Sequence, residues 1–478
     1  MAPPWADLTP DLLIQIAHRL DDLKSYVSAR GACKPWRRAL VSPFPALLVA
    51  TEDEHTMSLR RPTATSLATR RKPFQLAAIS SGCRCVGSTN GWLALCIRVK
   101  HRSAGDSSVL SSLAIGDYHS SALATHGQRH GDSNCYHTAF FLVNPVAGLE
   151  IELPPLFEEN RWISKLVFAP ARPTKDDFAA VAICNGVRII YVTARATSWA
   201  VHDFKIEERD QFVDLVYHGE GNKVYCLTRS GDVHVLHLPK RRLSCRQKPA
   251  IVEGLKLSVL RRPPKGIQVW SPNRLYIGIT LPVSTIDPCW KGSVESSDLN
   301  APATVEPLLS ADSYSFSSAT AFAPPYAALS AIIDAKYLVF CEGNLYQVWR
   351  NTSCTVNLRM PGVFGRRRRV NLGEMFVLRY YPDRWPCWDV VKDLGGYSFF
   401  VGKNNAVSLY AKGMPGLRGN CVYWIDRHGR EKGTIFDVQT GRSTPCQSPE
   451  AVVDAAPHGY KRTISFWYFL SDAVTTNS

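Results

Sequence analysis

The sequence lacks the long apolar segments of a membrane or secreted protein. No uncharged apolar run approaches the ~20 residues needed to cross a bilayer. The first residues, MAPPWADLTPDLL, contain no basic stretch followed by an apolar one, so a secretory signal is not expected. Close cysteine pairs are scarce as well: among 14 cysteines only Cys83 and Cys85 are close neighbours. We therefore expect a protein of the cytoplasm or nucleus, with reduced cysteines that act mostly as small buried hydrophobes.

Recognisable catalytic and metal-binding patterns are also missing. The chain has no GxSxG, no HExxH and no glycine-rich phosphate loop. Its 13 histidines are scattered, and His119, His126 and His130 fall in a stretch rich in serine and glycine. His234 and His237 are three residues apart in a predicted strand, so we expect them on opposite faces of a sheet. The sequence predicts no enzymatic activity, no metal and no cofactor.

Charged residues are numerous, but they are not clustered in the sequence. The net charge of +15 comes from 56 basic and 41 acidic residues, dispersed except for short runs such as Arg366–Arg369. That run is flanked by Gly365 and Val370, which favours a solvated loop, with a nuclear import signal as the alternative. Nucleic-acid binding requires basic residues on one face. It is kept as an alternative function and is not favoured.

The first 45 residues carry the most specific pattern, three short helices. Thr9 can cap the first helix, and Pro10 suits its first position. One apolar stripe follows on this helix: Leu12, Leu13, Ile16 and Leu20. Asp21 and Asp22 can cap a second helix, and a third is predicted to begin near Pro35. A piece of this size cannot bury enough apolar surface to be stable alone, so a partner or a neighbouring domain must complete its core.

This segment resembles the F-box, whose pattern runs from a Leu-Pro helix start to a Cys-Lys-x-Trp-Arg ending. The residues at pattern positions are Leu8, Leu12, Leu13, Ile16, Arg19, Leu20, Cys33, Lys34, Trp36 and Arg37. Thr9 stands where the family usually has proline, and Gly31–Ala32 replaces a bulkier apolar pair. The resemblance implies docking of a Skp-family adaptor, and through it a cullin. The residues expected to make this contact are Leu8, Pro10, Leu12, Leu13, Ile16, Leu20, Cys33 and Trp36.

Beyond Pro73 the helical period gives way to short apolar runs separated by Gly, Asn, Asp and Pro, which is typical of an all-β domain. Hairpins are predicted within 221–238, 337–350, 399–411 and 420–441. Many similar hairpins favour a β-propeller, with two stacked β-sandwich domains as the alternative. In a propeller, the apolar C-terminal segment with Trp467 and Phe469 is expected to pair with an early strand and so close the ring.

The segment LGGYSFFVGKNNAVSLYAKGMPGLRGNCVYWID (394–426) resembles the end of the KIB-type β-propeller of plant F-box proteins, a domain of unknown function. Ile464–Trp467 is similar to the terminal strand of that domain. The fold we expect is mainly β, a three-helix F-box followed by a propeller of six or seven blades. The expected boundaries are 1–45 for the F-box, 46–72 for a linker and 73–470 for the propeller, with serine-rich loop insertions near 100–137 and 291–320.

Together these resemblances imply a substrate-recognition adaptor of a cullin-RING ubiquitin ligase, in which the propeller binds a protein target. The target and the propeller face that binds it stay open at this point. The alternative is a propeller that binds nucleic acid or another partner without any link to a ubiquitin ligase. One binding measurement distinguishes the two interpretations, because only the first requires the helices near the N-terminus to bind a Skp-family protein.

Overall fold

The structure is a computed structural model of the 478-residue chain. It describes residues 5, 8–52, 59–67, 74–76, 84–100, 136–156, 162–174, 176–194, 196–202, 210–219, 223–238, 305–307, 321–323, 325–333, 335–353, 355–359, 367–382, 384, 386–426, 433–446 and 462–469. Within these residues the helices are α1 (Pro10–His18), α2 (Leu23–Gly31), α3 (Lys34–Ala39) and α5 (Tyr326–Ile332). The three N-terminal helices lie where the sequence predicts them, and strands dominate the rest.

Three four-stranded sheets form the first half of the β region. The first has the order β27-β1-β2-β3, with β1 (Ala46–Glu52), β2 (Leu59–Ser66), β3 (Phe74–Gln75) and β27 (Arg462–Tyr468). The second runs from β4 to β7, with β4 (Arg84–Thr89), β5 (Trp92–Lys100), β6 (Tyr136–Asn144) and β7 (Leu149–Leu156). The third runs from β8 to β11, with β8 (Ile163–Thr174), β9 (Asp177–Cys184), β10 (Arg188–Thr193) and β11 (Ala200–His202).

The remaining strands make three larger sheets and one small one. The fourth sheet is β12 (Phe212–His218), β13 (Lys223–Thr228), β14 (Val233–His237) and β15 (Val305–Pro307). The fifth is β16 (Ala335–Cys341), β17 (Asn344–Arg350), β20 (Met375–Tyr380) and β21 (Trp388–Val390). The two-stranded sheet is β18 (Val356–Arg359) with β19 (Arg367–Val370). The sixth has the order β23-β22-β24-β25-β26, with β22 (Tyr397–Val401), β23 (Val407–Tyr410), β24 (Cys421–Trp424), β25 (Thr434–Asp437) and β26 (Arg442–Pro445).

The predicted hairpins are present, and tight turns explain one of them and two further hairpins. Glu342–Gly343 joins β16 to β17 with φ values of 48° and 71°. Asn90–Gly91 and Asn185–Gly186 repeat the same pair of positive φ angles between β4 and β5 and between β9 and β10. Two successive positive φ angles give the turn whose twist matches antiparallel strands, and Asn and Gly adopt that conformation at the least cost. The pairs β13–β14, β22–β23 and β24–β25 are also antiparallel, as expected.

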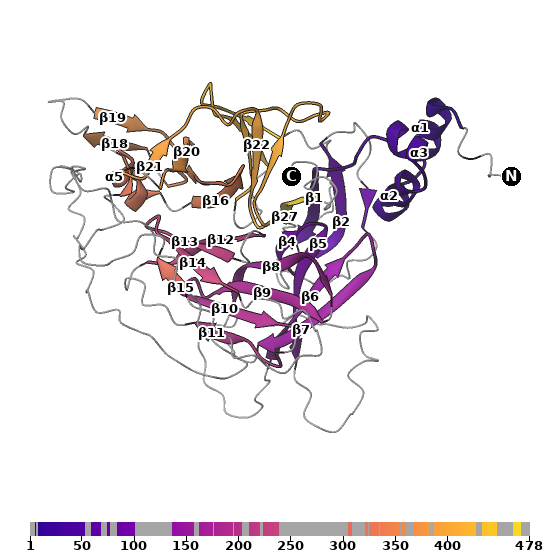
Figure 1. Ribbon diagram of the computed structural model, residues 1–478, viewed down its shortest axis with the longest axis horizontal. Helices are drawn as coiled ribbons and strands as arrows, with labels where there is room; N and C mark the ends of the chain where they lie inside the picture. The colour runs from indigo at the N-terminus through magenta and orange to yellow at the C-terminus, as the bar shows by residue number, and fades with distance from the viewer. Residues whose placement is uncertain are drawn as a thin grey trace, which may run out of the picture.

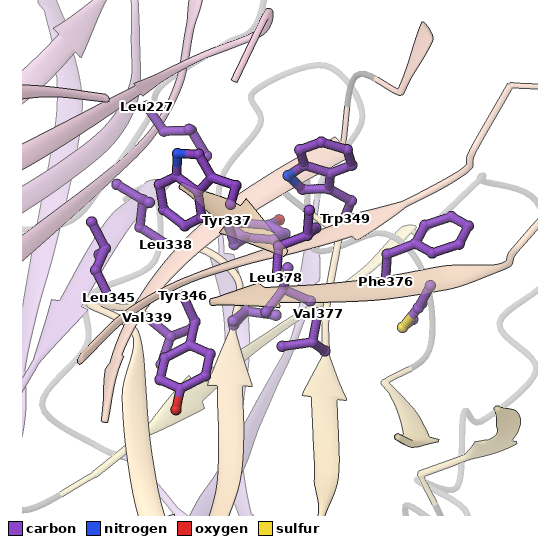
Figure 2. Packing of buried hydrophobic residues seen from close by; sticks show 14 of the residues in the cluster. Leu227, Tyr337, Leu338, Val339, Leu345, Tyr346, Trp349, Phe376, Val377 and Leu378 are labelled. Atoms are coloured by element: carbon purple, nitrogen blue, oxygen red, sulfur yellow. The ribbon is translucent and has the colours of Figure 1, made fainter. Parts of the chain in front are cut away.

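The buried side chains link the sheets in a circuit. Separate apolar clusters join the first sheet to the second, the second to the third, and the third to the fourth. A large cluster, part of which Figure 2 shows around Tyr337 and Trp349, joins the fourth, fifth and sixth sheets. A last cluster joins the sixth sheet back to β1 and β27 of the first. Each sheet therefore shares a core with two neighbours, which is the arrangement of a propeller and differs from that of two stacked sandwiches.

The C-terminal strand completes this circuit by pairing with the first strand. β27 is antiparallel to β1, with Leu47 opposite Trp467 and Ala46 opposite Tyr468. The Trp467 and Tyr468 side chains are fully buried. The expected pairing of the C-terminal segment with an early strand is confirmed.

Three sequence-based expectations need correction. The 46–72 segment was expected as a linker, yet it supplies β1 and β2 to the first sheet. Arg366–Arg369 was expected on a solvated loop, yet residues 367–370 form β19. Within the insertion expected near 291–320, residues 305–307 form β15 and pair with β14. β1 and β15 are fixed by distant partners, β27 and β14, which local sequence does not reveal, whereas β19 pairs with the nearby β18. Most of the other insertion, near 100–137, lies outside the described residues.

Candidate partner-binding surface

The N-terminal helices begin at the residues that the sequence marks. Pro10 opens α1, whose first turn also holds Asp11, while Thr9 makes no side-chain capping bond. The Asp22 carboxylate caps α2 by accepting the Ser25 backbone N–H at 2.9 Å. α3 contacts both α1 and α2 and so holds the three helices together.

The inner face of the helices is part of the β domain's core. Leu13 and Ala17 of α1 are 2% and 4% exposed, and they belong to the apolar cluster that joins the first two sheets. Tyr26 of α2 packs on Phe74 of β3 with ring centroids 5.0 Å apart. Its hydroxyl donates to the Val41 carbonyl at 2.9 Å. The helices therefore pack on the first sheet, and Figure 1 shows them beside β1 and β2.

The outer face of α1 is apolar and open. Leu12 is 47% exposed, Ile14 is 41% exposed and Ile16 is 36% exposed. Leu12 and Ile16 are four residues apart, so they lie one above the other on the same side of the helix. Leu8, another four residues earlier, is half-buried. Isolated exposed leucines are ordinary, but an apolar row on a fixed helix is typical of a surface that binds a partner.

The eight residues predicted to contact an adaptor divide into three groups. Pro10, Leu12 and Ile16 are exposed and stand on one helix. Leu8, Leu20, Cys33 and Trp36 are half-buried. Leu13 is buried in the chain's own core and is unavailable to any partner, which corrects its assignment. Leu13 follows Leu12 by one position, and an apolar stripe broad enough to include both does not show which of them faces the sheet.

Two exposed residues next to this surface had no signal in the sequence pattern. Trp5 is 63% exposed, and its carbonyl accepts the Trp36 indole N–H at 2.8 Å. Val41, which follows α3, is 42% exposed. The three helices and their connections also carry exposed charged residues: Asp11, Arg19, Asp21, Lys24, Lys34, Arg37 and Arg38. An apolar centre with a charged rim is the usual build of a protein-protein interface.

Apart from the apolar surface on α1, a cluster of polar side chains lies inside the circuit of sheets. The Lys165 ammonium of β8 forms an ion pair with the Asp214 carboxylate of β12, and both side chains are almost fully buried. Asp214 also accepts the Leu338 N–H at 2.8 Å. Burial lowers the pKa of Lys165 and raises the pKa of Asp214, while each partner opposes the shift of the other. These groups connect β8, β12 and β16 through side chains that are 5% and 0% exposed.

The Gly402–Asn405 turn extends this cluster. The Gly402 carbonyl accepts the Lys165 ammonium at 3.1 Å, and the Asn405 N–H donates to the Ser88 carbonyl at 2.7 Å. The Asn405 side chain pairs with both backbone groups of Tyr217, at 2.7 Å and 3.2 Å. One turn of the sixth sheet thus ties together the inner strands of the second, third and fourth sheets. Residues so far apart in sequence give no local pattern, and the sequence analysis missed them.

The described residues contain no group of three or more His, Cys, Asp or Glu side chains placed to hold a metal ion. In the same part of the chain, no helix has the length and apolar character needed to span a bilayer. Most of the described cysteines are buried.

Comparison with known proteins adds a family to these observations. The family model described as KIB1-4 beta-propeller matches residues 58–440, most of the chain. No curated protein matches the sequence. Among solved structures, apo AztD from Citrobacter koseri aligns at 9% identity over 84% of this chain and 94% of the AztD chain. Its TM-score of 0.25 is too low for that similarity to bear on the fold or the function.

Proposed function

Because the chain belongs to the KIB1-4 beta-propeller family, we propose that it is a substrate-recognition adaptor of a cullin-RING ubiquitin ligase. In this proposal α1–α3 are an F-box that docks a Skp-family protein and through it a cullin. The six sheets of four or five strands are the blades of a propeller that holds the protein target. The role is one of binding without catalysis, in the cytoplasm or nucleus.

The observation that carries the proposal is the division of α1 into two apolar faces. One face, with Leu13 and Ala17, is used by the chain itself. The other, with Leu12 and Ile16, is left open although it lies on the same well-packed helix. Burying a Leu or Ile side chain stabilises a complex by ~1.5–3 kcal/mol, so an open row of this kind favours association.

The seating of the helices supports the same conclusion. Association costs ~4–15 kcal/mol in lost freedom, and ordering a flexible segment would add to that cost. Here the Tyr26 contact with Phe74 and the Arg30 bond to the Leu40 carbonyl, at 3.1 Å, fix α2 before any partner binds. Because the helix face is ordered before binding, little of the free energy of binding is lost in ordering the helices.

The experiment is a binding measurement between the full chain and a purified Skp-family protein. The variant Leu12→Ala/Ile16→Ala removes two anchors from the open face and leaves Leu13 in place. Interface anchors contribute ~2 kcal/mol or more each. Two of them correspond to roughly a thousandfold loss of affinity at 1.4 kcal/mol per decade. The thermal unfolding midpoint should stay where it is, because both side chains are exposed.

The matched control is Leu149→Ala/Val187→Ala, which truncates two apolar residues that are 56% and 40% exposed, one on β7 and one in the turn between β9 and β10. It should bind the adaptor as the wild type does. No binding by the wild type, or equal binding by the α1 variant, would contradict the F-box interpretation. Because folding is monitored in the same samples, a loss of binding through unfolding is recognised directly.

A further inference from the structure

Two arginines flank one tyrosine ring at the end of the fifth sheet. Arg379 lies near the end of β20, and Tyr381 and Arg384 follow that strand. The guanidinium carbon of Arg384 is 3.6 Å from the centre of the Tyr381 ring, and that of Arg379 is 5.1 Å from it. We call Arg379, Tyr381 and Arg384 the arginine–tyrosine cluster. Figure 1 shows β20 and β21 on the side of the molecule away from α1–α3, so a partner on the helices does not cover this cluster.

The arginine–tyrosine cluster holds more positive charge than its neighbours neutralise. The strand register places Arg379 opposite Asp389 of β21, yet the Asp389 carboxylate pairs with Arg384 at 3.0 Å. Both side chains of that pair stay partly exposed, at 45% and 41%. Within the residues that the structure describes, no acidic side chain forms an ion pair with Arg379, whose contacts are with Asn344 and Tyr381. Two guanidinium groups therefore share one carboxylate.

Arg379 is oriented before any partner binds. Its Nη2 donates to the Asn344 side-chain oxygen at 2.7 Å, and the Asn344 amide nitrogen donates to the Glu342 carbonyl at 2.9 Å. The Glu342 carboxylate accepts the Tyr397 hydroxyl at 2.7 Å, so a series of polar contacts joins Arg379 to the sixth sheet. A guanidinium carries several N–H donors, and here its bonded acceptor is a neutral amide. Such a group, fixed in place, is suited to an incoming oxyanion.

The charges at this end of the sheet favour a carboxylate over a phosphate. The two arginines and Asp389 together leave a single positive charge, which one carboxylate neutralises. A phosphoryl group carries about −1.5 to −2 charges at neutral pH and would place an excess of negative charge beside Asp389 and Glu342. The predicted ligand is therefore the side chain of an aspartate or glutamate.

Aromatic rings beside the charges favour a protein as the carrier of that carboxylate. Tyr397 and Tyr410 pack with ring centroids 5.2 Å apart, and Tyr410 is 39% exposed. Tyrosine and arginine are enriched where proteins bind other proteins, because they offer apolar contact area together with hydrogen bonds. This pair lies next to the cluster through the Tyr397 bond to Glu342.

We propose that the arginine–tyrosine cluster binds an acidic side chain of a partner protein, with Arg379 as the charged contact and the Tyr397–Tyr410 pair as the apolar contact beside it. The inference deepens the proposed function and rests on it for one point, namely that this partner is the protein to be ubiquitinated. The target then contacts the fifth and sixth sheets, on the side of the molecule away from the adaptor.

The test uses the full chain and three acetylated, amidated nonapeptides of glycine and serine with a central Leu-X-Leu, in which X is glutamate, glutamine or phosphoserine. Broadening of the peptide NMR signals over a concentration series measures weak affinities. We expect the glutamate peptide to bind about tenfold more tightly than the glutamine peptide, which corresponds to ~1.4 kcal/mol. It should also bind more tightly than the phosphoserine peptide, because the site offers one uncompensated charge.

The variant Arg379→Gln removes the unpaired cation and leaves the Arg384 pair with Asp389 intact. It should bind the glutamate peptide about tenfold more weakly than the wild type does, and the glutamine peptide equally. The control Arg442→Gln removes the same charge from an exposed position on β26 and should bind all three peptides as the wild type does. Thermal unfolding of both variants is recorded in the same samples.

Three results would each overturn the proposal: equal binding of the glutamate and glutamine peptides to the wild type, tighter binding of the phosphoserine peptide, or an unchanged affinity of folded Arg379→Gln for the glutamate peptide. The first two need no variant, so they decide the question even if Arg379→Gln does not fold. The adaptor is absent from all of these measurements. Failure here therefore leaves the F-box interpretation standing, and failure of adaptor docking leaves this site standing.

Discussion

The interior of the sheet circuit and the outer face of α1 contain the same kinds of apolar side chain, which are buried in the first and exposed on the second. Inside the circuit Leu47, Trp467 and Phe400 are buried, and the ion pair of Lys165 with Asp214 is almost fully buried. On α1, Leu12 and Ile16 stand exposed on a helix that is equally well packed from behind. The difference shows that apolar character alone does not distinguish a core from a binding surface. What decides is whether the chain itself covers the residue.

Removing β27 should have the largest effect, because it opens the circuit. A chain that ends at Lys461 loses Phe466, Trp467, Tyr468 and Phe469, all of them buried. At ~1.5–3 kcal/mol each, their burial stabilises the fold by roughly 6–12 kcal/mol. That is comparable with the whole stability of a typical domain, about 5–15 kcal/mol. Size-exclusion chromatography and thermal unfolding should show an aggregated or unfolded product. A chain that ends at Phe469 is the control, and a monomeric, normally melting product from the shorter chain would contradict the closing role of β27.

Breaking the buried ion pair should come next. Lys165→Met leaves the Asp214 carboxylate buried without its cation, a change that typically costs ~3–5 kcal/mol. The double variant Lys165→Met/Asp214→Asn keeps an acceptor for the Leu338 N–H and removes the unpaired charge, so it should recover much of that loss. Chemical denaturation of both variants measures the difference. If both variants are destabilised equally, the unpaired charge of Asp214 is not the cause of the loss of stability.

The two neighbouring leucines of α1 provide the sharpest comparison. Leu13→Ala should lower the free energy of unfolding by ~2–5 kcal/mol, because the residue is 2% exposed in the core between the first two sheets. Leu12→Ala should change it by less than about 0.5 kcal/mol, because the residue is 47% exposed. Urea unfolding of the two variants, which differ by one position and share one chemistry, checks this directly. A similar loss in both would show that α1 has no open face.

Local signals in the sequence were enough for much of this fold. Asp22 and Pro10 marked the starts of two helices, and Glu342–Gly343 marked a hairpin, because caps and turns depend on residues a few positions apart. Sheet membership was harder. The sequence predicts a linker at the first strand, Ala46–Glu52, because the strand's partner Arg462–Tyr468 lies at the other end of the chain.

The sequence predicts the residue types of the candidate site. It predicts only partly which of these residues face the sheet and which are exposed to a partner. The spacing of Leu12, Leu13 and Ile16 indicated an amphipathic helix, and the helix is there. Which side of the stripe faces the sheet depends on Phe74 and Tyr26, whose contact no local pattern encodes. The link between Lys165 and Asp214 crosses two sheets and was invisible for the same reason.

The smallest expected effect is a dependence on pH that comes from His234 on β14. His234 lies on β14 with its ring 5.9 Å from the ring of Phe212, and burial lowers its pKa from 6.5 to about 4, while the Asp210 carboxylate opposes the shift. The folded chain thus keeps this histidine neutral, whereas the unfolded chain protonates it below pH 6.5. The unfolded state binds more protons between these two values, so the free energy of unfolding should fall as the pH drops from 6.5 to 4. At 1.36 kcal/mol per pKa unit, the upper limit of this fall in the free energy of unfolding is about 3 kcal/mol.

Denaturation of the wild type and of His234→Gln at pH 7.5 and pH 4.5 isolates the contribution of this residue, because every other titrating group is shared. The difference in stability between the two proteins should shrink or reverse at the lower pH, and a difference that stays constant would show that His234 is protonated to the same extent in both states.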